Sequence, residues 1–253
     1  MASPRSGPSM TWKVEREWEG EVCAVLASGP SMTRQVADTV RASGCRSIAV
    51  NNQGVAFGGH PAMAPWADIL YASDARWWHN HAKEAMAFKG RKVTISQTGD
   101  RVPNLIDESV AVMSHGGVQG FDPRPTHLRT GHNSGFAAVH LAIHFGVRRV
   151  VLCGFDMHGK RGEHWFGDHA WRRGYRSRYV LFLNTFKGAA GEFLARAEVV
   201  NCSPGSALKC FPFMELREAL NGLPDLPEAA PETAAAAAPA FRSAGPQAAT
   251  GAA

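Results

Sequence analysis

Short apolar runs recur along the chain, separated by polar or amphipathic sequence. Such runs, rich in β-branched residues, are typical of strands that are buried on both faces of a sheet. We interpret six of them as strands, at residues 21–28, 46–52, 67–74, 92–97, 147–156 and 197–204. Residues 31–43 and 133–146 have helical spacing. The alternation predicts an α/β fold, a Rossmann-like and mostly parallel sheet with helices on both faces.

Composition separates this domain from the two ends of the 253-residue chain. Residues 223–253 are rich in Ala and Pro and carry few side chains that could be buried, so we expect a disordered tail. Residues 1–20 are expected to form a flexible N-terminal segment. A single domain over residues 21–222 remains.

The remaining composition excludes some classes of protein. No apolar run approaches the roughly 20 residues of a membrane span, and the N-terminus lacks a signal peptide's apolar segment, so we expect a cytoplasmic protein. The five cysteines form no C-x-x-C pair, which favours reduced structural thiols. Seven tryptophans could stack on sugars or bury an interface of a homo-oligomer.

Small and polar residues follow four of the predicted strands. In a parallel α/β sheet the carboxyl ends of the strands share one edge, where ligands bind. The residues at or directly after the carboxyl ends of these strands are Ser28, Gly29, Pro30 and Ser31, then Asn51 and Asn52, then Asp74, and finally Gly154 and Asp156. We therefore expect a ligand site at this edge.

Two predicted helices begin beside such residues. Gly29 permits a close backbone approach, and Ser31 is expected to cap helix 31–43, whose N-terminus could bind a phosphate. Thr130, His132, Asn133 and Ser134 stand at the start of the second helix, and Gly131 and Gly135 there permit a close backbone approach. In both places the polar residue could instead serve only as a cap. Neither the Walker loop nor the G-x-G-x-x-G fingerprint is present.

Acid–base groups are concentrated in residues 154–171, within a His-, Trp- and Arg-rich segment that we interpret as a short lid at about 157–185. His164, Asp168 and His169 lie there among tryptophans and phenylalanines, a composition suited to general base catalysis. The same three residues could bind a metal or make structural hydrogen bonds, although their spacing matches no metal-site template. His140 and His144 are interpreted as packed or solvent-facing, and no metal site is predicted.

Several segments, in this order, resemble the bacterial sialyltransferases of glycosyltransferase family 42. They are "VLASGPSM", "AVNNQGVAF", "ADILYASD", "TGHNSGFAAVHLAIHFGVRRVVLCGFDM" and "VVNCSPGSALKCFPFMEL". The same core is similar to the 6-hydroxymethylpterin diphosphokinase-like family and, most closely, to uncharacterised phage and prophage proteins. The resemblance covers residues 21 to about 216.

The resemblance implies roles for matching residues. It implies that Gly29, Pro30 and Ser31, with Asn51 or Asn52, hold a nucleotide, and that Asn133, Ser134 and Gly135 contact the donor sugar or phosphate. Ser203, Pro204 and Ser206 would line a cytosine pocket, and His164 or His169 would be a metal-free base. Because only about forty residues separate Asp156 from Val199 and the chain has only three tyrosines, sialic acid itself is not expected as the donor sugar.

Three functional hypotheses follow. The first is a glycosyltransferase that takes a nucleotide-linked, CMP-sugar-like donor, with no tightly bound cofactor and an unidentified acceptor. The second is a diphosphokinase that uses ATP and Mg²⁺ at Asp74 or Asp156. The third is a phage-type accessory protein without catalysis, which binds a nucleotide or DNA through the arginines between Arg172 and Arg178.

Overall fold

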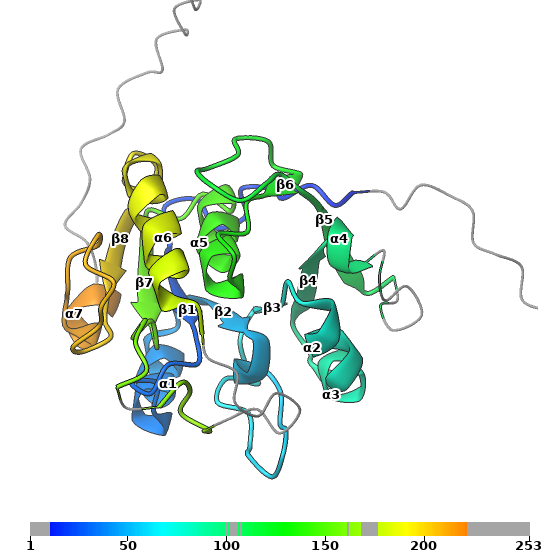
Figure 1. Ribbon diagram of the computed structural model, residues 1–253, viewed down its shortest axis with the longest axis horizontal. Coiled ribbons are helices and arrows are strands. Elements are labelled where there is room, and N and C mark those ends of the chain that lie inside the picture. Colours follow the sequence, from blue (N-terminus) through cyan, green and yellow to red (C-terminus); the bar gives the residue numbers. More distant parts are fainter. Residues whose placement is uncertain are drawn as a thin grey trace, which may run out of the picture. The chain divides into compact units, whose positions relative to one another are not determined.

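The computed structural model describes residues 11–99, 101, 106, 108–160, 162–167 and 177–221. These residues form a parallel sheet of eight strands in the order β6-β5-β4-β3-β2-β1-β7-β8 (Figure 1). The strands are β1 (Val22–Leu26), β2 (Arg46–Val50), β3 (Ile69–Tyr71), β4 (Arg91–Ile95), β5 (Val110–His115), β6 (His127–Leu128), β7 (Arg149–Cys153) and β8 (Glu198–Asn201). All seven strand pairings are parallel, which confirms the predicted fold class.

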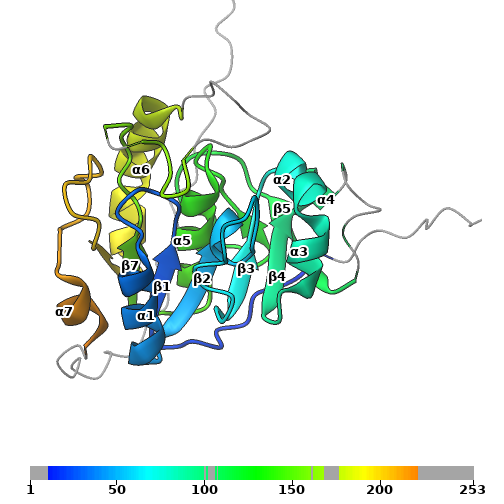
Figure 2. The ribbon, with the colours of Figure 1, turned by 90° about the horizontal axis from the view of Figure 1, so that it is seen from below.

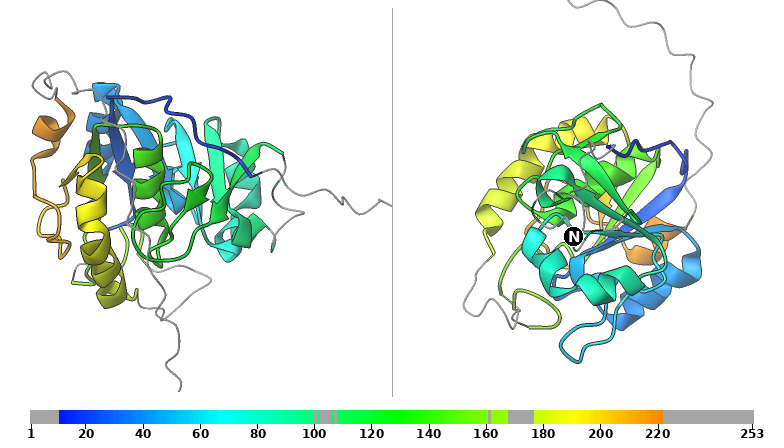
Figure 3. Two further views of the ribbon diagram at one scale, coloured as in Figure 1. Left: turned by 90° about the horizontal axis from the view of Figure 1, so that it is seen from above. Right: turned by 90° about the vertical axis from the view of Figure 1, so that its right-hand side faces the viewer.

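Helices cover both faces of this sheet. They are α1 (Arg34–Ser43), the short 3₁₀ helix η1 (Asn51–Gln53), α2 (Ala75–Asn80), α3 (Ala82–Ala87), α4 (Ser96–Gly99), α5 (Ser134–His144), α6 (Tyr179–Leu194) and α7 (Leu216–Leu220). Successive side chains of a strand point to opposite faces. In β1, Leu26 belongs to the same buried cluster as residues of α1, whereas Val25 belongs to the cluster that contains residues of α5 and α6. Figures 2 and 3 show α1 on one face of the sheet and α5 and α6 together on the other.

The order of the strands defines one point where the chain changes direction. From β1 the chain moves outward through β2 to β6, and it then returns to the other side of β1 as β7. Loops that leave β1 and β7 at their carboxyl ends therefore diverge to opposite sides, which opens a crevice between them. The sheet topology thus places a crevice where the sequence predicted a ligand site.

One expectation about the elements was wrong, and two strands were not predicted. The predicted lid reached residue 185, but α6 begins at Tyr179 and buries Phe186, Ala189 and Phe193 in the core. Two glycines in α6, Gly188 and Gly191, weaken the helical signal in the sequence. The sequence analysis also left β5 and β6 unassigned.

Residues 11–20 are not a flexible segment. Val14 and Trp18 are buried, and the Trp18 ring stacks on Phe145 at a centroid distance of 4.0 Å. Backbone hydrogen bonds from Trp12 N to Val112 O and from Trp18 N to Phe145 O fix this segment on the domain. Burial of Val14 and Trp18 therefore makes residues 11–20 part of the domain. The predicted flexibility of residues 1–10 and disorder of 223–253 lie outside the described residues.

The other structural expectations concern cysteines and membranes. All five cysteines are free thiols, and burial raises the pKa of Cys23 and Cys153, which makes them poor nucleophiles. Within the described part of the chain, no helix combines the length and apolar character needed to cross a bilayer.

Candidate functional site

A cavity of about 520 Å³ lies at the carboxyl edge of the sheet. Loops from both sides of the β1–β7 crevice contribute to it, together with the loops after β2, β3 and β4. Its polar lining consists of Ser28, Asn51, Ser73, Asp74, Thr98, Arg101, Thr130, His132, Asn133, Ser134, Asp156, Glu163, His164, Ser177 and Tyr179. Gly29, Gly135, Gly154 and Met157 line it as well. The structure therefore gathers residues from six separate segments around one polar space.

Backbone strain is concentrated in this lining. Among the described residues other than glycine, positive φ angles occur only at Asn51 (54°), His132 (62°) and Met157 (55°), and all three line the cavity. The left-handed region is costly for most side chains other than glycine, by about 1–3 kcal/mol in strained cases, and it is tolerated best by Asn. Such outliers cluster at functional sites, so their coincidence here identifies the cavity as the candidate site.

The loops after β1 and β7 meet through Asp156. Its carboxylate accepts hydrogen bonds from Ser31 N at 3.1 Å and from Ser31 Oγ at 2.7 Å. A Cβ atom at Gly29 would lie 2.1 Å from Asp156 Oδ2 and 2.4 Å from Gly154 O, so only glycine fits at this crossing. Ser28 and Gly29 reach the cavity, whereas Pro30 and Ser31 do not line it.

The predicted cap of the first helix was wrong. Helix α1 begins at Arg34, and Thr33 is its N-cap, with Oγ1 accepting from Val36 N. The Ser31 N–H is not available for a ligand phosphate in this geometry because the Asp156 carboxylate already accepts from it. Ser31 instead contacts Asp156 in the loop after β7, and the local sequence does not reveal this long-range contact.

The two asparagines after β2 have different surroundings. Asn51 lines the cavity, and its buried Oδ1 has no hydrogen-bond partner among the described residues. Asn52 is buried behind the cavity, where its Oδ1 accepts from Trp77 Nε1. Because a buried acceptor without a partner is unfavourable, Asn51 is suited to receive a hydrogen bond from a ligand.

The start of α5 offers donors to the cavity. Asn133 is its N-cap, with Oδ1 accepting from Phe136 N at 2.8 Å. Ser134 and Gly135 follow in the first turn, where backbone N–H groups have no acceptor inside the helix. Ser134 Oγ accepts from Ser73 N at 3.2 Å, which orients the hydroxyl. A helix start with free N–H groups in a polar cavity is suited to an anion.

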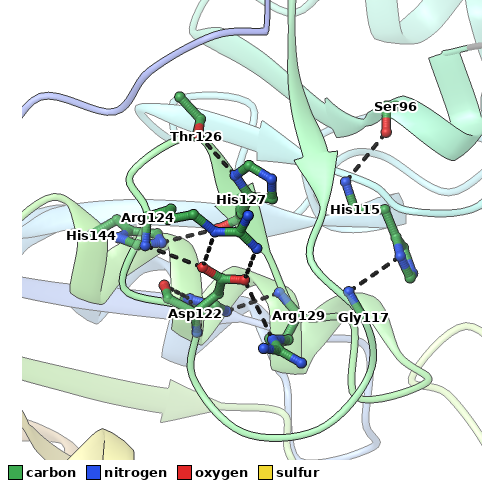
Figure 4. Close-up of polar contacts among 10 residues, drawn as sticks. Ser96, His115, Gly117, Asp122, Arg124, Thr126, His127, Arg129 and His144 are labelled. Atoms are coloured by element: carbon green, nitrogen blue, oxygen red, sulfur yellow. Dashed lines mark hydrogen bonds and ion pairs between the residues drawn. The ribbon is translucent and has the colours of Figure 1, made fainter. Parts of the chain in front are cut away.

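A polar network fixes the segment that leads into α5 (Figure 4). The Asp122 carboxylate accepts from Arg124 Nη2 at 2.7 Å, and Arg129 Nε lies 3.6 Å from it. His140 Nδ1 accepts from Arg129 N, the residue directly before Thr130 of the cavity. Burial, aided by the nearby His144, lowers the pKa of His140 to about 3, so this imidazole is neutral.

His140 and His144 are therefore structural residues, as one of the sequence interpretations held. Their rings stack at 4.7 Å, and the His144 Nε2 hydrogen-bonds to His127 O. Across the described residues, no group of three His, Cys, Asp or Glu side chains is arranged to hold a metal ion.

The described part of the predicted lid closes one side of the cavity. His164 lines the cavity, and its ring stacks on Phe166 at 4.8 Å. Trp165 N donates to Ser28 O, which attaches this loop to the end of β1. Burial opposes ionisation of Glu163, but hydrogen bonds from Ser177 and Tyr179 and the charge of His164 lower its pKa overall. Asp168, His169 and Arg172 lie outside the described residues.

Three predicted residues lie away from the cavity. Ser203, Pro204 and Ser206 are absent from its lining. Ser203 Oγ accepts from Phe155 N at 2.8 Å, and Ser206 Oγ donates to Phe155 O at 2.6 Å. These two serines hold the loop after β7 in place.

Sequence reasoning did not assign some of the lining residues to the site. Among them are Thr98, Arg101, Met157 and Tyr179. Thr98 follows a predicted strand, so the strand-end argument could have included it. His132 directly precedes Asn133, but no sequence signal indicated its backbone conformation.

Comparison with known proteins supports the fold. No protein-family model and no curated protein matches the chain. Among solved structures, the MAf glycosyltransferase from Magnetospirillum magneticum AMB-1 matches with a TM-score of 0.55 and 16% identity, over 81% of this chain and 35% of that chain. This chain thus spans about a third of that protein's length.

A second solved structure also matches. It is the sialyltransferase CstII from Campylobacter jejuni, in complex with the substrate analogue cytidine-5′-monophosphate, at a TM-score of 0.44 and 12% identity over 81% of this chain and 89% of that chain. At 16% identity, the likeness to the MAf glycosyltransferase is one of fold.

Proposed function

We propose that the protein is a glycosyltransferase-like enzyme that binds a nucleotide-linked sugar donor in this cavity. One observation carries the proposal: a single polar cavity at the β1–β7 switch point combines an unpartnered buried acceptor, a free helix start and all three strained non-glycine residues of the described chain. Ligands of open α/β sheets bind at such a point. The fold shared with the MAf glycosyltransferase is consistent with this.

The lining suggests how the donor lies. Its phosphate accepts hydrogen bonds from the N–H groups of Ser134 and Gly135 and from the Ser134 hydroxyl. A hydroxyl or amino group of the nucleoside donates to Asn51 Oδ1, which otherwise lacks a partner. Nucleotide and sugar together match the size of a cavity of this volume.

His164 is the base in this proposal. It takes the proton from an acceptor hydroxyl as the acceptor oxygen bonds to the anomeric carbon of the sugar. The bond between that carbon and the leaving phosphate oxygen breaks, and its electron pair stays on the phosphate. The loop that carries His164 is attached to the segment after β2, because the rings of Trp165 and Phe166 pack edge-on against Phe57 at centroid distances of 6.2 and 4.6 Å.

Thermal unfolding of the purified protein tests this proposal. The unfolding temperature is measured with CMP, UDP, GDP, ADP and ATP, each with and without Mg²⁺. A nucleotide at 100 times its dissociation constant adds about 2.7 kcal/mol to the free energy of unfolding. We expect stabilisation by a pyrimidine nucleotide without metal. Stabilisation by ATP alone, and only with Mg²⁺, would instead identify a diphosphokinase, and an unresponsive protein would contradict both enzyme hypotheses.

Two variants refine the test. Asn51→Gly removes the side chain at a position where φ is 54°, so the fold is retained while nucleotide stabilisation is lost. His164→Gln keeps nucleotide stabilisation and loses turnover of the donor by about 10²–10⁴-fold. Full turnover in His164→Gln would exclude His164 as the base.

A further inference from the structure

A second imidazole, His132, faces the same cavity from another element. His164 lies in the loop between β7 and α6, whereas His132 lies in the loop between β6 and α5. His132 is exposed, and no described residue hydrogen-bonds to its ring. It differs in this from His140 and His144, whose rings are buried and hydrogen-bonded.

The conformation of His132 is held by its neighbours. Its φ of 62° follows the Gly131 φ of 52°, and Thr185 Oγ1 of α6 lies 3.0 Å from Gly131 O, with Leu181 O and Phe182 O as its other two acceptors. On the other side, Asn133 caps α5, and its Nδ2 donates to Gly131 O as well. The Asn133 side chain thus fixes the turn that carries His132, and the Thr185 hydroxyl packs against the same carbonyl.

His132 also lies next to the proposed phosphate position. It stands two residues before Ser134 and three before Gly135, whose N–H groups form the free helix start. We therefore expect an anion bound at that helix start to lie within reach of the His132 side chain. His164, from the lid loop, approaches the same space from a different segment.

Resting on the proposed function, we propose that His132 is the proton donor to the leaving phosphate of the nucleotide-linked donor. As the bond from the anomeric carbon to the phosphate oxygen breaks, the electron pair remains on that oxygen and the protonated imidazole of His132 gives it a proton. His164 gains the proton of the acceptor hydroxyl in the same reaction. One proton is thereby moved from acceptor to leaving group, and both imidazoles return to their starting states by exchange with water.

The positive φ provides variants that do not disturb folding. Asparagine and glycine both tolerate the left-handed region, so His132→Asn and His132→Gly retain the backbone without an imidazole. His79→Asn, at an exposed position of α2 outside the cavity lining, is the matched control. We expect all three to unfold at or near the wild-type temperature.

Binding is tested by NMR of histidine-labelled protein. The His132 ring resonance is identified as the one missing from His132→Asn. We expect CMP or UDP to shift this resonance and to leave that of His79 in place. If either nucleotide stabilises the protein thermally and the His132 resonance does not move, the inference is overturned while the proposed function stands.

Catalysis is tested by release of free CMP, UDP or GDP from the corresponding sugar nucleotides. We expect His132→Asn and His132→Gly to lower kcat by at least about 10²-fold with little change in KM, and free imidazole to restore turnover to His132→Gly only. Wild-type kcat in both variants would overturn the inference. If no nucleotide stabilises the wild-type protein, the proposed function fails, and the role of His132 fails with it.

Discussion

Single residues at the crossing of the β1 and β7 loops define the shape of the cavity. Gly29 N donates to Gly154 O at 2.9 Å, and the Asp156 carboxylate receives both donors of Ser31. Asp156 is 2% exposed, so its charge is compensated by these donors rather than by water. The same contacts place Ser28 and Met157 on the cavity wall.

We predict that Gly29→Ala destabilises the protein by about 1–3 kcal/mol, because the new methyl group collides with Asp156 Oδ2 and Gly154 O. Chemical denaturation of the two proteins measures the difference. Gly188→Ala is the matched control: its Cβ meets no atom within 4 Å, and alanine in helix α6 stabilises by about 0.5–1 kcal/mol. Equal effects of the two substitutions would refute the steric explanation.

Among the elements, β6 and α5 are coupled through buried polar groups rather than through apolar contacts alone. His140 on α5 accepts from Arg129 N, and its Nε2 hydrogen-bonds to the backbone of Asp122. Asp122 in turn binds Arg124, whose guanidinium lowers the pKa of that carboxyl well below its usual range. Helix α5 therefore begins at a fixed place, which positions Asn133 and Ser134 in the cavity.

The burial of His140 predicts that the free energy of unfolding decreases in mild acid. The pKa of His140 is lowered from 6.5 to about 3 by burial, so between these values only the unfolded chain takes up the proton. The free energy of unfolding should fall as pH decreases from about 6.5, by up to about 1.4 kcal/mol per pH unit from this group. Asp122, with its lowered pKa, loses its contribution only as the pH falls below its ordinary value of 3.8.

Urea denaturation at pH 7, 6, 5 and 4 measures this dependence. In His140→Gln the slope should be shallower, with a remainder from His144, whose pKa is also lowered by burial. The exposed His79→Gln should keep the wild-type slope. Parallel pH profiles for wild type and His140→Gln would show that His140 does not govern acid sensitivity.

Across the whole domain, the segment before β1 joins parts that are distant in sequence. Trp18 stacks on Phe145 at the end of α5, and Trp12 N donates to Val112 O in β5. Figure 3 shows this segment, in dark blue, running along the sheet before it enters β1. It therefore contributes to the stability of the domain.

We predict that Trp18→Ala costs about 3–5 kcal/mol of unfolding free energy, because a buried ring is lost from the core. Trp12→Ala should cost less, since Trp12 is only partly buried. Denaturant unfolding provides both values. A negligible loss in Trp18→Ala would mean that residues 11–20 are not part of the cooperative unit.

The arrangement of the sheet was largely predictable from the sequence. Apolar strands such as β1, β2 and β7 are buried on both faces and were visible as continuous apolar runs. β6 is too short, at two residues, to leave a pattern, and β5 is only partly buried. Small polar residues after Leu26, Val50, Tyr71 and Cys153 also marked the correct edge of the sheet.

The sequence by itself determined the fold class, the edge of the sheet that carries the cavity and several lining residues, because hydrophobic periodicity and strand-end chemistry are local properties. Only the tertiary structure decided that Asp156 occupies the Ser31 N–H, that Asn52 is buried against Trp77 while Asn51 faces the cavity, and that His132 lines it. These outcomes depend on contacts between segments as many as 125 residues apart and on left-handed backbone angles, which no local pattern encodes.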